Sequence, residues 1–415
     1  MDNRPSCCPG QSSELTSNAC YCAQNYAPLP VVLESGKGIY LTDIHGKRYI
    51  DCTSAYSAVN FGHCHETIVK TAIEQLSTLC ITSRAFSNPC LCPFMKALCQ
   101  FTGFEVGLPM NTGAEAVETA IKIARKWAYK KKGVAPEKAE IIVAGGNFHG
   151  RTTTLISFST CTQYQEGFGP LTPGFKVIPF NDTVALENAI HGNTAAFLVE
   201  PIQGEAGIII PDAGYLKKCQ EICHKHGVLL LCDEIQTGLG RTGKILASYH
   251  DDVQPDGVML GKSLGGGVYP VSAFLTSHAI MEVIEPGDHG STFGGNPLAG
   301  AIGIASLKLI TEESLCERAT EMGDYFIQAL KEIESQAIDE IRGKGLMIAL
   351  ELNPEKISAK ALALQLIKKG VLTKDTHSTV LRLAPPLIIK RKEIDSVVSA
   401  IRECLQQFPA KKASC

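Results

Sequence analysis

The sequence has no long apolar run and no excess of charge of either sign. No stretch reaches the roughly 18 continuous apolar residues that a membrane-spanning helix requires, so we expect no membrane partner. The 39 basic residues are balanced by 42 acidic ones, which excludes a broad basic surface for nucleic acid. Hydrophobic residues make up 45% of the 415-residue chain, which is enough for a large core and suggests two or three folding units.

The C-x-x-C spacing of redox and metal motifs is also missing, although the chain has 17 cysteines. A disulfide framework is typical of short secreted chains, whereas this chain is long and shows no apolar signal segment. Cys219 and Cys223, with His224 and His226 close by, leave a metal cluster open as an alternative. We favour free thiols in a reducing compartment and predict no metal.

Basic residues are scarce at the start of the chain, where Arg4 is the only one among residues 1–25. No Arg-rich mitochondrial presequence is present, so we expect a cytoplasmic protein, or a mitochondrial matrix protein if a presequence has been removed. The same 25 residues are rich in Ser, Cys, Asn, Pro and Gln, and we predict that they form a flexible tail.

Apolar runs alternate with helical patterns through the middle of the chain. Four runs read as buried strands, at 141–144, 195–199, 228–232 and 257–260. Helices are predicted near 114–130 and 214–226, as well as at 66–80. This alternation predicts an α/β fold with a mainly parallel sheet that is covered by helices on both faces.

The pattern changes after Gly300 and predicts a second, smaller α+β domain. Longer amphipathic helices are expected there, with two short strands between them, at 301–334, 359–369, 391–407, 346–352 and 380–383. A hairpin at 36–51, with its turn at His45-Gly46, is expected to join this domain. We therefore divide the chain into a tail, an N-terminal segment that joins the small domain, a large domain and a small domain, at 1–25, 26–65, 66–300 and 301–415.

Two charged residues lie at the ends of buried strands. Asp233 ends the run at 228–232, and Lys262 comes two residues after the run at 257–260. Functional groups of open α/β sheets gather beyond the carboxyl ends of the strands. A structural salt bridge is one alternative for this pair. A phosphate-binding P-loop is excluded, because its first glycine would fall at Asp256.

A buried lysine can lose its proton and attack a carbonyl group, and a carboxylate can hold a pyridinium nitrogen protonated. Lys262 and Asp233 thus provide the two anchors that pyridoxal 5′-phosphate (PLP) needs. Asn111-Thr112-Gly113 opens a helix whose N-terminus suits a phosphate. Hydroxyl groups in a Gly-rich loop and an aromatic-basic cluster add candidates, namely Ser291, Thr292, Phe148, His149 and Arg151.

These motifs resemble those of the class-III aminotransferases, which have the PLP fold type I. The resemblance runs from about Tyr26 to about Phe408 and includes “LPMNTGAEAVETAIKIARKW”, “GNFHGRT”, “VEPIQGEAGIIIPDAGYL”, “DEIQTGLGRTGK”, “LGKSLGGGVYPVSAF”, “HGSTFGGNPLA” and “LRLAPPL”. The stretches “SAYSAVN”, “TSRAF” and “LPMN” are more particular to the ornithine aminotransferases. The resemblance implies a large domain with a mainly parallel seven-stranded sheet, a smaller α+β domain and a homodimer with active sites at the interface.

The resemblance also implies roles for individual residues. Lys262 would bind PLP as a Schiff base and transfer protons, Asp233 would pair with the pyridine nitrogen, and Gln236 would approach the ring hydroxyl. Phe148 would stack on the ring, next to His149. Phosphate would be bound by Gly113 and Ala114, and by Ser291 and Thr292 of the neighbouring subunit. The expected substrate contacts are Tyr26, Tyr56, Arg151, Glu205 and Arg382.

The implied activity is transfer of the δ-amino group of L-ornithine to 2-oxoglutarate, which gives glutamate 5-semialdehyde and glutamate. The semialdehyde cyclises to pyrroline-5-carboxylate. The alternative is another class-III ω-aminotransferase that acts on N-acetylornithine, 4-aminobutyrate or lysine; Tyr26 and Tyr56 are the expected discriminators. A protein of this fold that binds partners without catalysis is a further alternative, against which Lys262, Asp233 and Arg382 argue.

Overall fold

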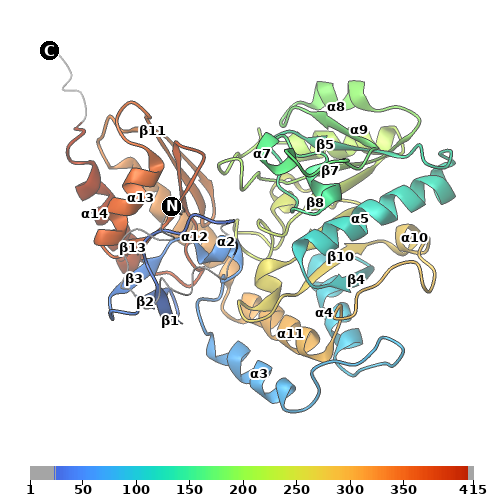
Figure 1. The fold of residues 1–415 in the computed structure, drawn as a ribbon, viewed down its shortest axis with the longest axis horizontal. Coiled ribbons are helices and arrows are strands. Elements are labelled where there is room, and N and C mark those ends of the chain that lie inside the picture. The colour runs from blue at the N-terminus through green and yellow to red at the C-terminus, as the bar shows by residue number, and fades with distance from the viewer. Residues whose placement is uncertain (1–22, 24, 410–415) are drawn as a thin grey trace, which may run out of the picture.

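The computed structural model describes residues 23 and 25–409 (Figure 1). A sheet of seven strands forms the centre of the larger unit, in the order β4 (Val106–Met110), β10 (Ser272–Thr276), β9 (Gly257–Leu260), β8 (Leu229–Asp233), β7 (Thr194–Val199), β5 (Glu140–Ala144) and β6 (Phe175–Ile178). Six strands run in one direction, and β10 runs antiparallel to both β4 and β9. The predicted α/β fold with a mainly parallel seven-stranded sheet is therefore confirmed.

Helices cover both faces of this sheet because successive strand side chains point to opposite sides. In β5, Ile141 and Val143 pack into one apolar cluster with the helix α5 (Gly113–Trp127). Ile142 packs instead into a second apolar cluster on the other face of the sheet, together with residues of α8 (Thr183–Ala189) and α9 (Tyr215–Lys225). The strands are thus buried from both sides, which explains their continuous apolar runs.

Two smaller sheets form a second unit. One has the order β1 (Leu33–Lys37), β2 (Tyr40–Asp43), β3 (Arg48–Asp51), β13 (Val371–Leu372), and the other β11 (Ile338–Lys344), β12 (Met347–Leu352), β15 (Val380–Leu383), β14 (Lys374–Thr376). The helices of this part are α12 (Leu315–Lys331), α13 (Ala359–Lys368) and α14 (Arg391–Leu405). Because β3 pairs in parallel with β13, the N-terminal and C-terminal segments share one sheet.

The region 301–334 differs from the single amphipathic stretch that the sequence predicts. It contains α11 (Pro297–Glu312) and α12, separated at Ser314, whose φ of +49° is left-handed. Most of α11 is buried, because it packs against α3 (Glu66–Leu76) and α4 (Leu91–Thr102). The division drawn at residue 300 therefore falls inside a helix.

Several strands lack the apolar runs that would have revealed them. β4 has the sequence VGLPM, and its proline is tolerated because β4 is an edge strand. β11 has the sequence IDEIRGK and is also an edge strand, with polar residues facing outward. The remaining short elements are α2 (Ser54–Ser57), α6 (Thr153–Ile156), α7 (Thr162–Gln165), α10 (His278–Met281), the π-helical segment η2 (Ala128–Lys132) and the 3₁₀ helices η3 (Ala247–Asp251) and η4 (Lys262–Gly265).

Within residues 25–409, no helix is long and apolar enough to cross a membrane. Cys219 and Cys223 are buried free thiols of α9. His224 lies 3.2 Å from Asp256, and no group of three or more metal-binding side chains is found in the described part of the chain. The predicted tail at 1–25 lies almost wholly outside the described residues.

Candidate active site

A cavity of about 210 Å³ opens at the carboxyl ends of the central strands. Parallel strands bring the residues that follow them to one edge of the sheet. Asp233 is the last residue of β8, and Lys262 follows β9. The residues that line the cavity include eight of those predicted from the sequence, namely Gly113, Ala114, Phe148, His149, Glu205, Asp233, Gln236 and Lys262.

Lys262 begins the turn η4 in a strained backbone conformation. Its φ is +47°, in the left-handed region that non-glycine residues rarely adopt. Burial lowers the pKa of its ammonium group to about 8, although the negative charge of Glu205 opposes this shift. About a tenth of the amine is therefore unprotonated at pH 7, far more than for an ordinary lysine, and the unprotonated amine is the form that attacks a carbonyl group.

Asp233 is held in one orientation by two hydrogen bonds. Its Oδ1 accepts from the Ile235 backbone N–H at 3.1 Å, and its Oδ2 accepts from His149 Nδ1 at 2.7 Å. Burial of His149 opposes protonation, but the hydrogen bond and charge of Asp233 raise the pKa of the imidazole overall. The other ring nitrogen, Nε2, is buried without a partner. Both side chains line the cavity.

Glu200 also lines the cavity, and the sequence reasoning missed it. It follows β7 directly, just as Asp233 closes β8, so the rule that found Asp233 would have found Glu200. Its oxygens accept from the Phe148 N–H at 2.9 Å and the Gly204 N–H at 3.3 Å. Burial raises the pKa of its carboxyl group to about 7.

The N-terminus of α5 forms one end of the cavity. Thr112 caps the helix by accepting from the Glu115 backbone N–H at 3.2 Å, and Glu115 in turn accepts from Thr112 N at 2.7 Å. Gly113 and Ala114 then present the first N–H groups of a 15-residue helix to the cavity. A Cβ at Gly113 would lie 3.0 Å from Ile235 Cδ1, so glycine allows this close approach.

Arg382, from β15, meets two residues of the large unit beside the cavity. Its Nη1 donates to Glu205 Oε1 at 2.8 Å, and its Nη2 donates to Gln236 Oε1 at 3.1 Å. Gln236 Nε2 also donates to Glu205 Oε1 at 3.2 Å. Burial opposes the ionisation of Glu205, but the charge of Arg382 lowers its pKa overall. The Arg382 guanidinium lies 4.9 Å from the centroid of the Tyr56 ring.

The other predicted site residues lie further from the cavity. Arg151 is exposed, with its guanidinium 4.2 Å from the ring centroid of Tyr164 and 5.8 Å from that of Phe148. Tyr26 is 78% exposed. Ser291 accepts a hydrogen bond from Asn111 at 2.7 Å, and Thr292 is exposed; neither lines the cavity of its own chain.

Comparisons with known proteins agree with this geometry. The family described as aminotransferase class-III matches residues 21–405. The ornithine aminotransferases of Exiguobacterium sp. and Brevibacillus brevis are 54% and 51% identical over 383 residues, which cover 92% of this chain and 95% of each relative. The chain belongs to the class-III aminotransferases.

Solved structures of this family share the fold. The ornithine aminotransferase of Toxoplasma gondii has a TM-score of 0.93 at 42% identity and covers 96% of each chain. The acetylornithine aminotransferase of Elizabethkingia anophelis has a TM-score of 0.87 at 46% identity, over 95% of this chain and 98% of its own. This class-III aminotransferase is therefore a PLP-dependent transaminase.

The residues present fit PLP. A buried lysine with a lowered pKa, a carboxylate aligned by His149 and a helix N-terminus lie around one cavity. The lysine can react with the aldehyde of the cofactor, the carboxylate can pair with its ring nitrogen, and the helix N-terminus can bind its phosphate. The buried His149 Nε2 has no hydrogen-bond partner, so the one side-chain hydrogen bond of the imidazole is the one from Nδ1 to Asp233.

The pKa of Lys262 predicts how cofactor uptake by the apoenzyme depends on pH. Only the unprotonated amine reacts with an aldehyde, so below a pKa of about 8 the uptake rate should rise about tenfold per pH unit. Above that pH it should level off, whereas an ordinary lysine would continue to about pH 10.4. Absorbance changes on mixing apoenzyme with PLP measure this rate, with Lys262→Ala as background. A rate that does not level off would contradict the assignment.

Proposed function

We propose that the chain is an L-ornithine δ-aminotransferase that uses 2-oxoglutarate as amino acceptor and forms glutamate 5-semialdehyde and glutamate. The observation that carries this proposal is the ion pair of Arg382 with Glu205, at 2.8 Å, beside Lys262. The ornithine aminotransferases that resemble the chain over most of its length support the choice of donor.

PLP, when bound, supplies a carbonyl group for the substrate amine and a ring that accepts electron density. Lys262 would hold the cofactor covalently and afterwards move the proton at the reacting carbon through Nζ. Asp233 would keep the ring nitrogen protonated, and His149 would hold the carboxylate in place. Gly113 and Ala114 would bind the phosphate, Phe148 would cover a ring face, and Gln236 would approach the ring hydroxyl.

The Arg382–Glu205 pair explains how one site accepts two different substrates. Ornithine must present its δ-amine, with no carboxylate near the reacting carbon, whereas glutamate presents a carboxylate next to that carbon. Glu205 would neutralise Arg382 while ornithine is bound, and Arg151 with Tyr26 would hold the distant α-carboxylate. When 2-oxoglutarate enters, the pair would open, so that Arg382 binds the adjacent carboxylate and Arg151 the far one.

Replacing Glu205 by Ala tests this exchange. With Arg382 permanently available, we expect the rate of the half-reaction with glutamate to rise about 10-fold or more relative to the rate with ornithine. This is the change in rate that the free energy of one hydrogen bond to a charged group corresponds to. Transfer of the α-amine of ornithine should also appear. Stopped-flow absorbance of the cofactor gives both half-reactions, and Glu205→Gln, which keeps the shape, is the matched control. A fall of both rates together would show that the pair is only structural.

We also propose that the enzyme is a homodimer with sites at the interface. Apolar side chains around α3 and the following loop are exposed in the single chain, including Ile73 (59%), Leu76 (51%) and Phe86 (69%). In a dimer, Ser291 and Thr292 of one subunit would complete the phosphate site of the other. Sedimentation of the holoenzyme tests the oligomeric state, and a monomer that is fully active would contradict the shared site.

A panel of amine donors with 2-oxoglutarate tests the substrate. We expect L-ornithine to be turned over with formation of pyrroline-5-carboxylate, and N-acetylornithine, 4-aminobutyrate and lysine to be poorer by at least about tenfold. N-acetylornithine is the second candidate because of the structural similarity to the Elizabethkingia enzyme. Preference for it would overturn the proposal. Unchanged cofactor absorbance with all four amines would instead favour a non-catalytic protein.

A further inference from the structure

A left-handed turn of four residues lies beside Arg382. Ser54, Ala55, Tyr56 and Ser57 have φ angles of 45°, 44°, 59° and 72°, and none of them is glycine. Each position is unfavourable, because the Cβ of an L-residue crowds the following carbonyl oxygen. Neighbouring groups must therefore hold this turn, α2, in its observed conformation.

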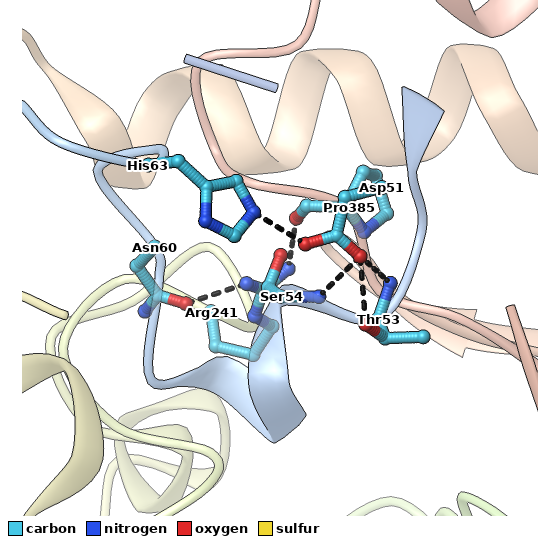
Figure 2. A network of polar contacts seen from close by, with 7 residues as sticks. All are labelled: Asp51, Thr53, Ser54, Asn60, His63, Arg241 and Pro385. Carbon is cyan, nitrogen blue, oxygen red and sulfur yellow. Dashed lines mark hydrogen bonds and ion pairs between the residues drawn. The ribbon is translucent and has the colours of Figure 1, made fainter. Parts of the chain in front are cut away.

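The carboxylate of Asp51 accepts the hydrogen bonds at the start of the turn, as Figure 2 shows. Its Oδ1 accepts from Thr53 N and Oγ1, both at 2.7 Å, and from Ser54 N at 3.1 Å. Its Oδ2 accepts from His63 Nε2 at 2.8 Å. His63 thus binds the oxygen that the turn does not use and fixes the plane of the carboxylate.

Asp51 stays ionised although only 1% of it is exposed. Burial opposes its charge, but the hydrogen bonds from His63 and Thr53 lower its pKa overall. A carboxylate with this many donors binds them more strongly than a neutral acceptor would.

Arg241 is the nearby buried cation, with 0% of its surface exposed. Its Nη1 donates to the carbonyl oxygens of Leu346, at 2.8 Å, and Pro385, at 2.6 Å, and its Nη2 donates to Asn60 Oδ1. Figure 2 shows Arg241 reaching from its own loop to the segments of Asn60 and Pro385. Burial lowers the pKa of Arg241 to about 9, and the charge of Asp51 opposes this shift. The network therefore joins the two units of the fold next to the turn.

The turn forms a wall of the space beside the cavity. Thr53, Tyr56 and Ser57 line a small pocket together with Gln236 and Arg382. A rotation of the turn would carry the Tyr56 ring away from the Arg382 guanidinium, which it faces at 4.9 Å. The position of the ring, and with it the shape of the substrate path, depends on the backbone of the turn.

We propose that Asp51 and His63 are positioning residues that hold the left-handed turn so that Tyr56 stays over Arg382 for substrate binding. His63 acts through Asp51, and Asp51 acts through the backbone of Thr53 and Ser54. Arg241 places a buried positive charge near Asp51 and holds Asn60, which follows the turn, to the segments of Leu346 and Pro385. This inference rests on the proposed function only for its choice of amino donor.

A double-mutant cycle between His63 and Tyr56 tests the proposal. His63→Leu should raise the KM for ornithine about tenfold, the loss expected for a hydrogen bond to a buried charge, and change kcat less than about twofold. His63→Gln, whose amide N–H can replace Nε2–H, should restore most of the wild-type KM. In a Tyr56→Ala background, His63→Leu should have almost no further effect on KM. Additive effects of the two changes would overturn the proposal.

Hydrogen exchange of the holoenzyme gives a readout that does not depend on turnover. In His63→Leu, the amides of Thr53 and Ser54 should exchange at least about tenfold faster than in the wild type, while those of β8 stay unchanged. Unchanged exchange at 53–58 would contradict the proposal even if KM rises. If the wild type prefers another amine, the proposed function fails, and the cycle is measured with that amine, so the two failures are distinguishable.

Discussion

Lys262→Ala is expected to abolish transamination, with a loss in kcat of at least about 10⁴-fold. The substitution removes two functions at once, because no amine remains to hold the cofactor covalently and no base remains for the proton transfer. Burial lowers the pKa of this amine to about 8, so a larger fraction of it is neutral near pH 7 than of a surface lysine. Measuring kcat with ornithine and 2-oxoglutarate at saturating PLP gives the result.

The control for this substitution is Lys218→Ala, which removes a lysine that pairs with Glu221 on the exposed face of α9. It should leave kcat and KM unchanged. Lys262→Ala should still bind PLP through the helix N-terminus and ring contacts, which equilibrium dialysis can measure. Near-normal turnover by Lys262→Ala would remove the basis of the proposed mechanism.

Asp233→Asn is expected to slow proton abstraction by about 10²–10³-fold while weakening PLP binding less than tenfold. A carboxylate next to a cation contributes about 4 kcal/mol at an effective dielectric constant of 20, before the cost of desolvation. Asn keeps the size of the side chain and an oxygen that can accept from Ile235, but it loses the charge. The charge matters most when the ring takes up electron density, so the reaction rate should suffer more than binding.

Single-turnover kinetics with a substrate deuterated at the reacting carbon measures the step directly. The isotope effect should rise in Asp233→Asn, because proton abstraction becomes the slow step. His149→Gln is the companion variant, since it leaves the charge of Asp233 and removes the imidazole that aligns it at 2.7 Å; we expect a smaller loss of about tenfold. Equal losses of binding and rate in Asp233→Asn would indicate a merely structural role.

Local sequence patterns determined the central strands and the residues at their ends. Apolar runs bounded by charged or turn residues located β5, β7, β8 and β9 to within one residue at either end. Asp233 and Lys262 could be predicted because a charge at the end of a buried strand is costly unless it has a partner. The edge strands β4 and β11 escaped prediction, because glycine, proline or charged residues interrupt their sequences, VGLPM and IDEIRGK.

Only the tertiary structure decided which distant residues meet. The Arg382–Glu205 pair and the Asp233–His149 hydrogen bond join residues that are far apart in the chain. The resemblance to class-III aminotransferases named these residues, but no spacing within the sequence predicts their contacts. The order of strands in the sheet and the packing of β15 against the large unit bring them together.

The sequence by itself thus determined the fold class and the cofactor chemistry, and it predicted Lys262 and Asp233 as the two residues that would carry that chemistry. The left-handed turn at 54–57 and the burial of Arg241 were decided by the tertiary structure alone. The physical reason is that secondary structure and strand ends depend on local preferences and burial, whereas a strained turn is stable only when a hydrogen-bond network that local patterns do not reveal compensates it. Asp51 and His63 supply the bonds at the start of the turn from within the N-terminal segment, whereas Arg241 bonds Leu346, Pro385 and Asn60, which come together only when the two units pack.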